Sequence, residues 1–365
     1  MLFLKQDKIC PFCFKAVRKN KRLAKGNDIQ CEYIGCEEND RCDKLFPKEM
    51  EKADFFPVVV VGAKGAGKSH FLGVALHELM SKDFEGKYGV VVNYCSDKHT
   101  GRRLRVYENT LYTKKELLTQ TDSVRTNPDI RLPMLFNLKF KRPPNGKKNL
   151  VLGFFDVAGE DFSAYEKNNL LSDYPVLSYA KAFILLLDPL QIPKVKDILS
   201  KADRSFDQSL LLEVAGTDTL ASDVLQRLRV ALGGKFNNIS LAVCFSKIDA
   251  ICGFNDMPSE DSPIYSEDTH IGDKSGKKPR VDINSLNLID GEIREWLKEM
   301  DCANFVYQAD IFKNMNCFFG ISSLGSGIKI LGKNNLKSPP EPIKVLDPIL
   351  WLLWDYGYID GENIK

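Results

Sequence analysis

Short apolar runs recur along the chain, and each ends in polar or glycine-rich residues. Continuous apolar runs of this length are typical of strands buried on both faces of a sheet. We expect such strands at 57–61, 89–94, 132–141, 150–155, 182–189, 241–245 and 317–319. Apolar residues at helical spacing predict helices over 68–80, 220–232 and 286–300. This alternation predicts an α/β fold with a mostly parallel sheet and helices on both faces.

Turn and loop signals divide the chain further. The sequence Pro-Pro-Asn-Gly at 143–146 separates two strand candidates and predicts a hairpin. The polar segment 96–127 is expected to be an insertion that contains a mobile region covering a ligand. Residues 190–236 and 253–284 are expected insertions too, and the second is rich enough in Pro, Ser, Asp, Gly and Lys to be partly disordered.

An aromatic stretch stands near the C-terminus, where residues 348–358 contain Trp351 and Trp354 and a glycine stop. We expect a short helix that docks on the main domain as core, and the alternative is an exposed tryptophan face that binds a partner. The expected parts are a cysteine-rich module at 1–50, a main domain at 51–340 and the docking helix at 341–365.

The first apolar run breaks into Gly-Ala-Lys-Gly-Ala-Gly-Lys-Ser at 62–69, and a helix follows. This spacing, after a buried strand and before a helix, is the Walker A pattern of a phosphate-binding loop. Its glycines let backbone N–H groups approach phosphate oxygens, and the helix N-terminus adds a favourable dipole. Lys68 can reach the β- and γ-phosphates, and Ser69 can bind Mg²⁺. The candidate nucleotide contacts are Gly62, Lys64, Gly65, Ala66, Gly67, Lys68, Ser69 and His70.

A second motif, Asp-Val-Ala-Gly, begins at Asp156 directly after the run 150–155. An aspartate at the carboxyl end of a strand beside a phosphate loop can hold Mg²⁺ through a water, and Gly159 can offer its N–H to a γ-phosphate. Thr126, in the polar segment expected to cover the nucleotide, is a candidate to close over Mg²⁺. The candidate Mg²⁺ ligands are therefore Ser69, Thr126 and Asp156.

A third motif, Ser246-Lys247-Ile248-Asp249, ends the run 241–245. A carboxylate accepts hydrogen bonds from both N1–H and the exocyclic amine of guanine, whereas adenine offers no such donor pair. The lysine stem can lie over the base. The motif therefore favours guanine, with Ser246, Lys247 and Asp249 as contacts. A turn after the run 317–319 adds Ser322, Ser323 and Leu324, and the Ser323 N–H is a candidate donor to guanine O6.

Five of the ten cysteines lie in the first 42 residues. In a reducing compartment such a cluster predicts metal binding rather than disulfides. Cys10 and Cys13 form one knuckle and Cys31 and Cys36 a looser second one, so these four are the expected Zn²⁺ ligands of a zinc ribbon. Cys42 competes with Cys36, which we choose because it flanks a compact turn with Cys31. The alternative is a set of free thiols in a small apolar lobe.

The overall charge does not indicate binding to nucleic acid or to an acidic membrane, because 51 basic and 49 acidic residues leave a net charge of +2. A basic stretch lies at 15–25, but we favour a solvated surface over a nucleic-acid contact because the acidic run 37–40 offsets it. The start does not read as a signal peptide, and no apolar stretch approaches the ~20 residues of a membrane span. We therefore expect a cytoplasmic protein.

In their order and on their predicted elements, the four motifs resemble a Ras-like, translation-factor-class P-loop GTPase domain over about residues 55–335. With the cysteine knuckles and the tryptophan-containing tail, the chain resembles the prokaryotic double-GTPase group of conflict-system proteins. The resemblance implies a GTP- and Mg²⁺-dependent regulator encoded beside defence components. It also implies protein partners, with a second GTPase or an effector as a separate chain.

Three residues depart from the pattern that this resemblance implies. Ser246 replaces the usual Asn or Thr, although its hydroxyl can still tether the phosphate loop. Glu160 stands where many Ras-like proteins carry the glutamine that orients the attacking water, and a carboxylate there repels the γ-phosphate and slows hydrolysis. Lys64 occupies a position that is often glycine, where it adds a phosphate contact or restricts the transition state. The candidate catalytic residues are Lys68, Thr126 and Glu160.

The sequence thus leads to a GTP-binding switch with slow, partner-stimulated hydrolysis. A pseudo-GTPase scaffold is the alternative, which binds GTP or GDP and acts through the zinc ribbon and the aromatic tail. An ATPase is a third reading. It would leave the motif 246–249 unexplained, and Glu160 is not adjacent to Asp156 as a Walker B pair requires.

Overall fold

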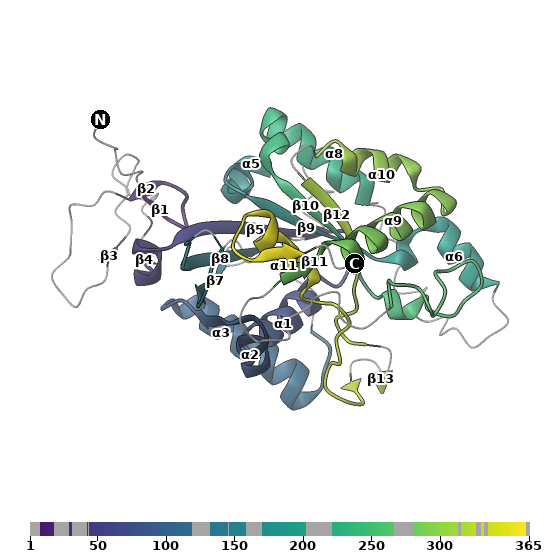
Figure 1. Ribbon diagram of the computed structural model, residues 1–365, viewed down its shortest axis with the longest axis horizontal. Helices are drawn as coiled ribbons and strands as arrows, with labels where there is room; N and C mark the ends of the chain where they lie inside the picture. The colour runs from purple at the N-terminus through teal and green to yellow at the C-terminus, as the bar shows by residue number, and fades with distance from the viewer. Residues whose placement is uncertain are drawn as a thin grey trace.

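The computed structural model describes residues 8–17, 29–30, 42, 44–118, 132–144, 146–157, 170–201, 221–265, 280–312, 315–325, 330–331 and 335–362. Its centre is a seven-stranded sheet in the order β12-β10-β9-β5-β8-β7-β6 (Figure 1). The strands are β5 (Asp54–Gly62), β6 (Val90–Tyr94), β7 (Met134–Phe140), β8 (Asn149–Asp156), β9 (Ala182–Leu187), β10 (Ser240–Phe245) and β12 (Met315–Gly320). Six of these strands run in one direction and β7 runs in the opposite direction, which confirms the mostly parallel sheet.

Helices cover both faces of this sheet, as predicted (Figure 1). On one face lie α5 (Leu170–Asp173), α6 (Pro193–Ser200), α8 (Ala221–Leu232), α9 (Ile283–Glu299) and α10 (Ala303–Asp310). On the other lie α1 (Lys68–Leu79), α2 (Lys82–Tyr88), α3 (Lys98–Tyr107) and α11 (Asp347–Asp355). Alternate valines of β5 enter the two cores, Val59 and Val61 on the first face and Val58 and Val60 on the second. Burial on both faces explains why the strand is a continuous apolar run.

The expected hairpin and helices form. β7 and β8 pair antiparallel, and α1, α8 and α9 match the periodic segments. The segment 96–127 is helical in its first part, where α3 continues into a π-helix at Glu108–Lys114. Leu104, Tyr107 and Leu111 are buried there, and a Cβ at Gly73 of α1 would lie 3.0 Å from the Leu111 side chain. This close approach of α3 and the π-helix to α1 orders residues that composition alone marked as a polar insertion.

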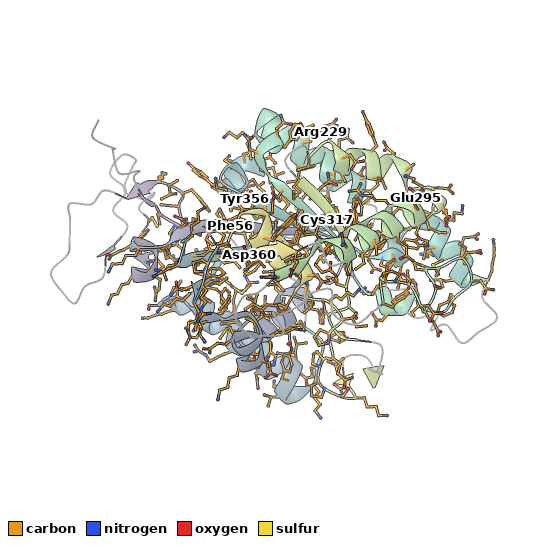
Figure 2. All side chains as sticks on the ribbon, viewed as in Figure 1. Phe56, Arg229, Glu295, Cys317, Tyr356 and Asp360 are labelled. Atoms are coloured by element: carbon orange, nitrogen blue, oxygen red, sulfur yellow. The ribbon has the colours of Figure 1, made fainter. Side chains whose placement is uncertain are left out.

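The C-terminal aromatic segment forms α11 and packs into the core. Trp351 is only 2% exposed, and its ring lies 5.7 Å from that of Phe319 on β12. Tyr356 meets Phe56 edge-on with ring centroids 4.4 Å apart (Figure 2). The burial of Trp351 removes it from any exposed tryptophan face, so α11 covers the sheet beside α1.

Smaller elements complete the chain. The pairs are β1 (Lys8–Ile9) with β2 (Ala16–Val17), β3 (Ile29–Gln30) with β4 (Leu45–Phe46), β11 (Arg280–Asp282) with β15 (Asp360–Glu362), and β13 (Ile330–Leu331) with β14 (Asn335–Leu336). In the third expected insertion, residues 251–265 form turns and bury Ile264. Within the described part of the chain, no helix is both long and apolar enough to cross a membrane.

Candidate nucleotide site

The glycine-rich loop joins β5 to α1 at the centre of the sheet. Gly62 has φ 154°, and a Cβ there would lie 2.5 Å from the carbonyl oxygen of Leu186 on β9. Gly65 and Gly67 have φ 78° and 84°, in the left-handed region that glycine tolerates best. The Phe71 N–H donates to Gly67 O at 2.8 Å, so the helix begins inside the motif. The loop therefore has the backbone that the sequence pattern requires.

Lys68 is folded back along this loop. Its Nζ donates to Gly62 O at 3.0 Å and to Ala63 O at 3.2 Å, and the residue is only 6% exposed. Two carbonyl acceptors hold the ammonium group over the loop. Ser69, half-buried, stands next to it in the first turn of α1. The charge and the hydroxyl expected at a phosphate site thus meet at one helix N-terminus.

Two further hydrogen bonds connect the loop and the start of α1 to other segments of the chain. Gln191 Nε2 donates to Lys64 O at 2.7 Å, while the Lys64 residue itself is exposed. His70 Nε2 accepts the Leu118 N–H at 3.1 Å. Burial and the positive charge of Lys247 lower the pKa of His70 to about 4, so its ring is neutral at pH 7. His70, a candidate nucleotide contact from the sequence, here anchors the residues after the π-helix.

Asp156 ends β8 beside the loop, in register with Val60 of β5. Its carboxylate is buried, with the residue 1% exposed. Arg103 of α3 approaches it, with Nη2 3.4 Å from Asp156 Oδ2, and the same nitrogen donates to the Tyr107 hydroxyl at 2.9 Å. The aspartate of the second motif therefore lies where the sequence predicts, with a cationic neighbour that the sequence analysis missed.

The third motif and the turn after β12 are bound together. The Ile248 N–H donates to Ile321 O at 3.2 Å, which links the end of β10 to the end of β12. Asp249 is half-buried, but its Oδ1 is buried and makes no hydrogen bond to any part of the chain that the structure describes. Burial raises the pKa of Asp249, while a hydrogen bond with Ser322 opposes the rise. An inward carboxylate oxygen with spare acceptor capacity fits a ligand that donates N–H groups.

The other residues that the sequence predicts as base contacts lie on the same turns. Ser322 Oγ accepts the Gly325 N–H at 3.0 Å, and Ser323 and Leu324 are half-buried between them. Ser246 Oγ donates to Leu187 O at 3.3 Å, so its hydroxyl holds the end of β9. The tether from Ser246 to the phosphate loop stays a prediction, because the hydrogen bond that the structure shows for this hydroxyl goes to Leu187 O.

Lys247 forms an ion pair with Asp188, at 2.7 Å from Nζ to Oδ2. Asp188 is fully buried and also accepts the Leu190 N–H at 2.9 Å. The sequence analysis did not single out Asp188. The sequence contained a pattern that points to Asp188, because this aspartate follows the apolar residues 182–187 in the same way that Asp156 follows 150–155. The signal for Arg103 and Gln191 was weaker, because only the folded chain brings them to the site.

Residues 57–277 match the family model described as Double-GTPase 2, which is more than half of the chain. The chain belongs to this family. Its fold and its motifs are those of a P-loop GTPase domain. None of the curated protein sequences matches the chain.

Solved structures offer only distant similarities to this GTPase domain. The Ski7 GTPase-like domain of S. cerevisiae, bound to GTP, is 16% identical with a TM-score of 0.32, over 84% of this chain and 51% of that one. A bacterial selenocysteine-specific elongation factor, EF-Sec, is 13% identical with a TM-score of 0.25, over 74% and 26%. A signal recognition particle receptor complex from Chaetomium thermophilum is 14% identical with a TM-score of 0.29, over 74% and 91%. The chain thus spans about a quarter of the EF-Sec chain and half of the Ski7 chain.

A cysteine cluster lies at the N-terminal end of the GTPase domain. The ligand atoms of Cys10, Cys13 and Cys42 all lie within 4.8 Å of one another, and the sulfurs of Cys10 and Cys42 are 3.9 Å apart. Tetrahedral Zn²⁺ with Zn–S bonds of ~2.3 Å holds its sulfurs about 3.8 Å apart, so the three thiols fit three of four ligand positions. The expected set left Cys42 out, whereas the structure places its thiol in this cluster. Cys31 and Cys36 lie outside the described residues.

The cysteine turn is packed against the GTPase sheet. Phe14, next to Cys13, has φ 57° and is 6% exposed. Its ring stacks on Tyr179 at 5.1 Å and lies 5.5 Å from Phe155, the neighbour of Asp156. Cys10 packs with Leu135 and Val151 on the same side of the sheet. The cysteine turn therefore packs on the face of β7 and β8 opposite to α1 and α3.

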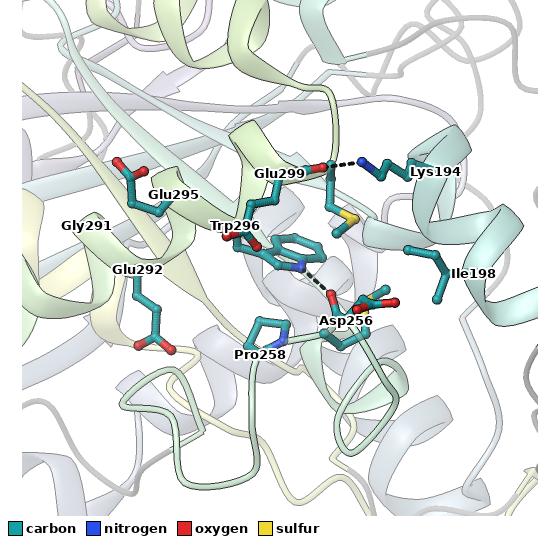
Figure 3. A pocket seen from close by; sticks show the side chains of 11 residues that line it. Lys194, Ile198, Asp256, Pro258, Gly291, Glu292, Glu295, Trp296 and Glu299 are labelled. Atoms are coloured by element: carbon teal, nitrogen blue, oxygen red, sulfur yellow. Dashed lines mark hydrogen bonds between the residues drawn. The ribbon is translucent and has the colours of Figure 1, made fainter.

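Three candidate residues, Thr126, Gly159 and Glu160, lie outside the described residues, as does most of the basic stretch 15–25. A separate pocket of about 810 Å³ lies between α6 and α9, with Trp296 at its floor (Figure 3). The Trp296 indole donates to Asp256 O at 3.3 Å, and Lys194 donates to Glu299 O at 2.7 Å. None of the predicted nucleotide contacts lines this pocket.

Proposed function

We propose that the chain is a GTP-binding switch that hydrolyses GTP slowly. The main support is the pairing of a formed phosphate loop with an inward carboxylate at the other end of the site. Gly62, Gly65 and Gly67 give the loop its backbone, and Lys68 is buried along it. Asp249 supplies the acceptor with spare capacity at the base side. The loop after β5 would then recognise the phosphates, and the turn after β10 in the same sheet would recognise the base.

Guanine is the proposed base because of the chemistry of Asp249. A buried carboxylate costs free energy unless donors satisfy it, and the N1–H and exocyclic amine of guanine form such a pair of donors. Adenine has no matching pair, so its binding would leave the carboxylate unsatisfied. We also propose that the Ser323 N–H meets guanine O6 and that Lys247 lies along the base.

The residues around Asp156 suit a Mg²⁺ site. Ser69 would hold the ion directly and Asp156 would hold it through a water, with Thr126 closing over it. Bound Mg²⁺ would neutralise charge on the β- and γ-phosphates. We propose that Lys68 holds the same phosphates and that Glu160 keeps hydrolysis slow by repelling the γ-phosphate. The cysteine cluster would hold Zn²⁺ as a structural ion.

Binding and turnover test this proposal together. We expect labelled GTP to bind about a hundredfold more tightly than ATP, because one buried acceptor discriminates between the bases. Lys68→Ala should abolish binding, and Lys82→Ala, an exposed lysine on α2, should not. ATP binding as tight as GTP binding would refute the guanine assignment. If GTP binds but phosphate release does not exceed that of Lys68→Ala, the chain is a pseudo-GTPase scaffold.

We propose in addition that a second GTPase is the partner, within a prokaryotic defence system. The support is the family description, which names a double GTPase, together with the single phosphate loop in the sequence. A purified partner GTPase should raise the rate of GTP hydrolysis by this chain at least tenfold over the rate alone. An unchanged rate across the GTPases encoded beside it would argue against this partnership.

A further inference from the structure

The buried pair of Arg103 and Asp156 carries an inference that rests on the proposed function. Arg103 reaches the end of β8 from α3, and its side chain is 17% exposed against 0% for that of Asp156. Nη2 lies 3.4 Å from Asp156 Oδ2 and 2.9 Å from the Tyr107 hydroxyl. A resident cation thus lies against the carboxylate that is proposed to hold Mg²⁺.

The charge of Arg103 is secure in this position. An arginine guanidinium stays protonated at any working pH, and the Asp156 carboxylate beside it favours the charged form. Its other terminal nitrogen, Nη1, is buried and makes no hydrogen bond to the residues that the structure describes. The guanidinium therefore keeps one donor in reserve inside the site, where phosphate oxygens or Mg²⁺-bound water would be acceptors.

We propose that Arg103 is a positioning residue that competes with Mg²⁺ for Asp156 and so sets the Mg²⁺ concentration at which the nucleotide is retained. Two cations beside one carboxylate repel each other, and the repulsion between a monovalent and a divalent cation is substantial at this range. Mg²⁺ must share Asp156 with Arg103 or move the guanidinium aside. Since α3 carries Arg103, the Mg²⁺ and nucleotide state of the site would reach α3 through this side chain.

The test is a Mg²⁺ titration of nucleotide release, which needs no turnover. The chain is loaded with fluorescent GDP, and the dissociation rate is followed as free Mg²⁺ is varied. Arg103→Gln should lower the Mg²⁺ concentration for half-maximal retention by on the order of tenfold. Arg103→Lys keeps the charge and should remain near wild type. Arg105→Gln changes an exposed arginine of the same helix and should leave the midpoint unchanged.

An unchanged or higher midpoint in folded Arg103→Gln would overturn the inference while the proposed function stands. If wild-type chain retains no guanine nucleotide at any Mg²⁺ concentration, the proposed function fails and the inference fails with it. If Arg103→Gln does not fold, Tyr107→Phe decides instead, because it removes the hydroxyl that holds Nη2. That variant frees Nη2 for Asp156 and should raise the midpoint about twofold to threefold, and an unchanged or lower midpoint would overturn the inference.

Discussion

The phosphate loop at 62–69 and the cysteine turn at 10–14 are both short turns with ligand groups, yet they are built in different ways. The phosphate loop is contiguous, and its shape depends on backbone angles at Gly62, Gly65 and Gly67. The cysteine turn supplies two thiols, and the third comes from Cys42, 32 residues after Cys10.

The difference lies in what holds each ligand group. Backbone N–H groups are fixed by the strand and helix on either side, so the loop needs few specific side chains beyond Lys68 and Ser69. A thiol cluster depends on side chains brought together by packing, here by Phe14 on Tyr179 and Phe155. A site built from backbone groups should therefore lose its function when its glycines are substituted. A site built from side chains should lose it when a single ligand residue far away in the sequence is substituted.

Gly62→Ala should have the largest effect. A Cβ 2.5 Å from Leu186 O cannot be accommodated without moving β9 or the loop. We expect a loss of about 4 kcal/mol in the free energy of unfolding, measured by urea denaturation. Gly86→Ala is the matched control, because nothing lies within 4 Å of that position and it is exposed in α2. It should stabilise by about 0.5–1 kcal/mol, and equal losses in the two variants would contradict the backbone account.

Asp249→Ala should come next, on the base side of the same site. This side resembles the cysteine turn, because residues from β10 and β12 must meet there. Loss of a charged bidentate acceptor should weaken GTP binding about a hundredfold, or about 3 kcal/mol, and leave ATP binding unchanged. The measurement is a competition titration with both nucleotides. Asp261→Ala, an exposed carboxylate, is the control, and parallel losses of GTP and ATP in Asp249→Ala would argue against base recognition.

Cys42→Ser should have a smaller effect, on metal content. We expect Zn²⁺ per chain to fall below half of the wild-type value and the free energy of unfolding to fall by about 2 kcal/mol, since metal binding couples to folding. Elemental analysis and thermal melting give the two readouts. Cys252→Ser removes a half-buried thiol outside the cluster and should change neither. Full Zn²⁺ in Cys42→Ser with loss in Cys36→Ser would restore the set chosen from the sequence.

These cases also separate what the sequence could predict from what it could not. The strands themselves, the loop at 62–69 and the place of Asp156 at a strand end follow from local patterns, because the residues that matter are neighbours in the chain. The order of the strands in the sheet depends on pairing between distant segments, so the sequence did not predict it. Spacing alone favoured Cys36 over Cys42, since the approach of Cys42 to Cys10 needs the folded module. Arg103 was missed for the same reason, because its partner lies 53 residues away on β8.

The smallest expected effect concerns His70, at the start of α1. It tests how far the stability of the phosphate loop depends on a side chain. Its pKa is lowered to about 4 in the fold, below its ordinary 6.5, so the unfolded chain binds more protons between these two values. Stability should fall as the pH drops through that window, because protonated Nε2 can no longer accept the Leu118 N–H.

The free energy of unfolding should fall by about 1.8 kcal/mol from pH 7 to pH 5, measured by urea denaturation at each pH. His70→Gln should flatten this part of the pH dependence. His77→Gln, which changes a histidine bonded to Glu108 on the exposed side of α1, should leave it in place. If the wild-type slope survives in His70→Gln, another group carries it, and the phosphate loop is then independent of the His70 side chain, as a site built mainly from backbone would be.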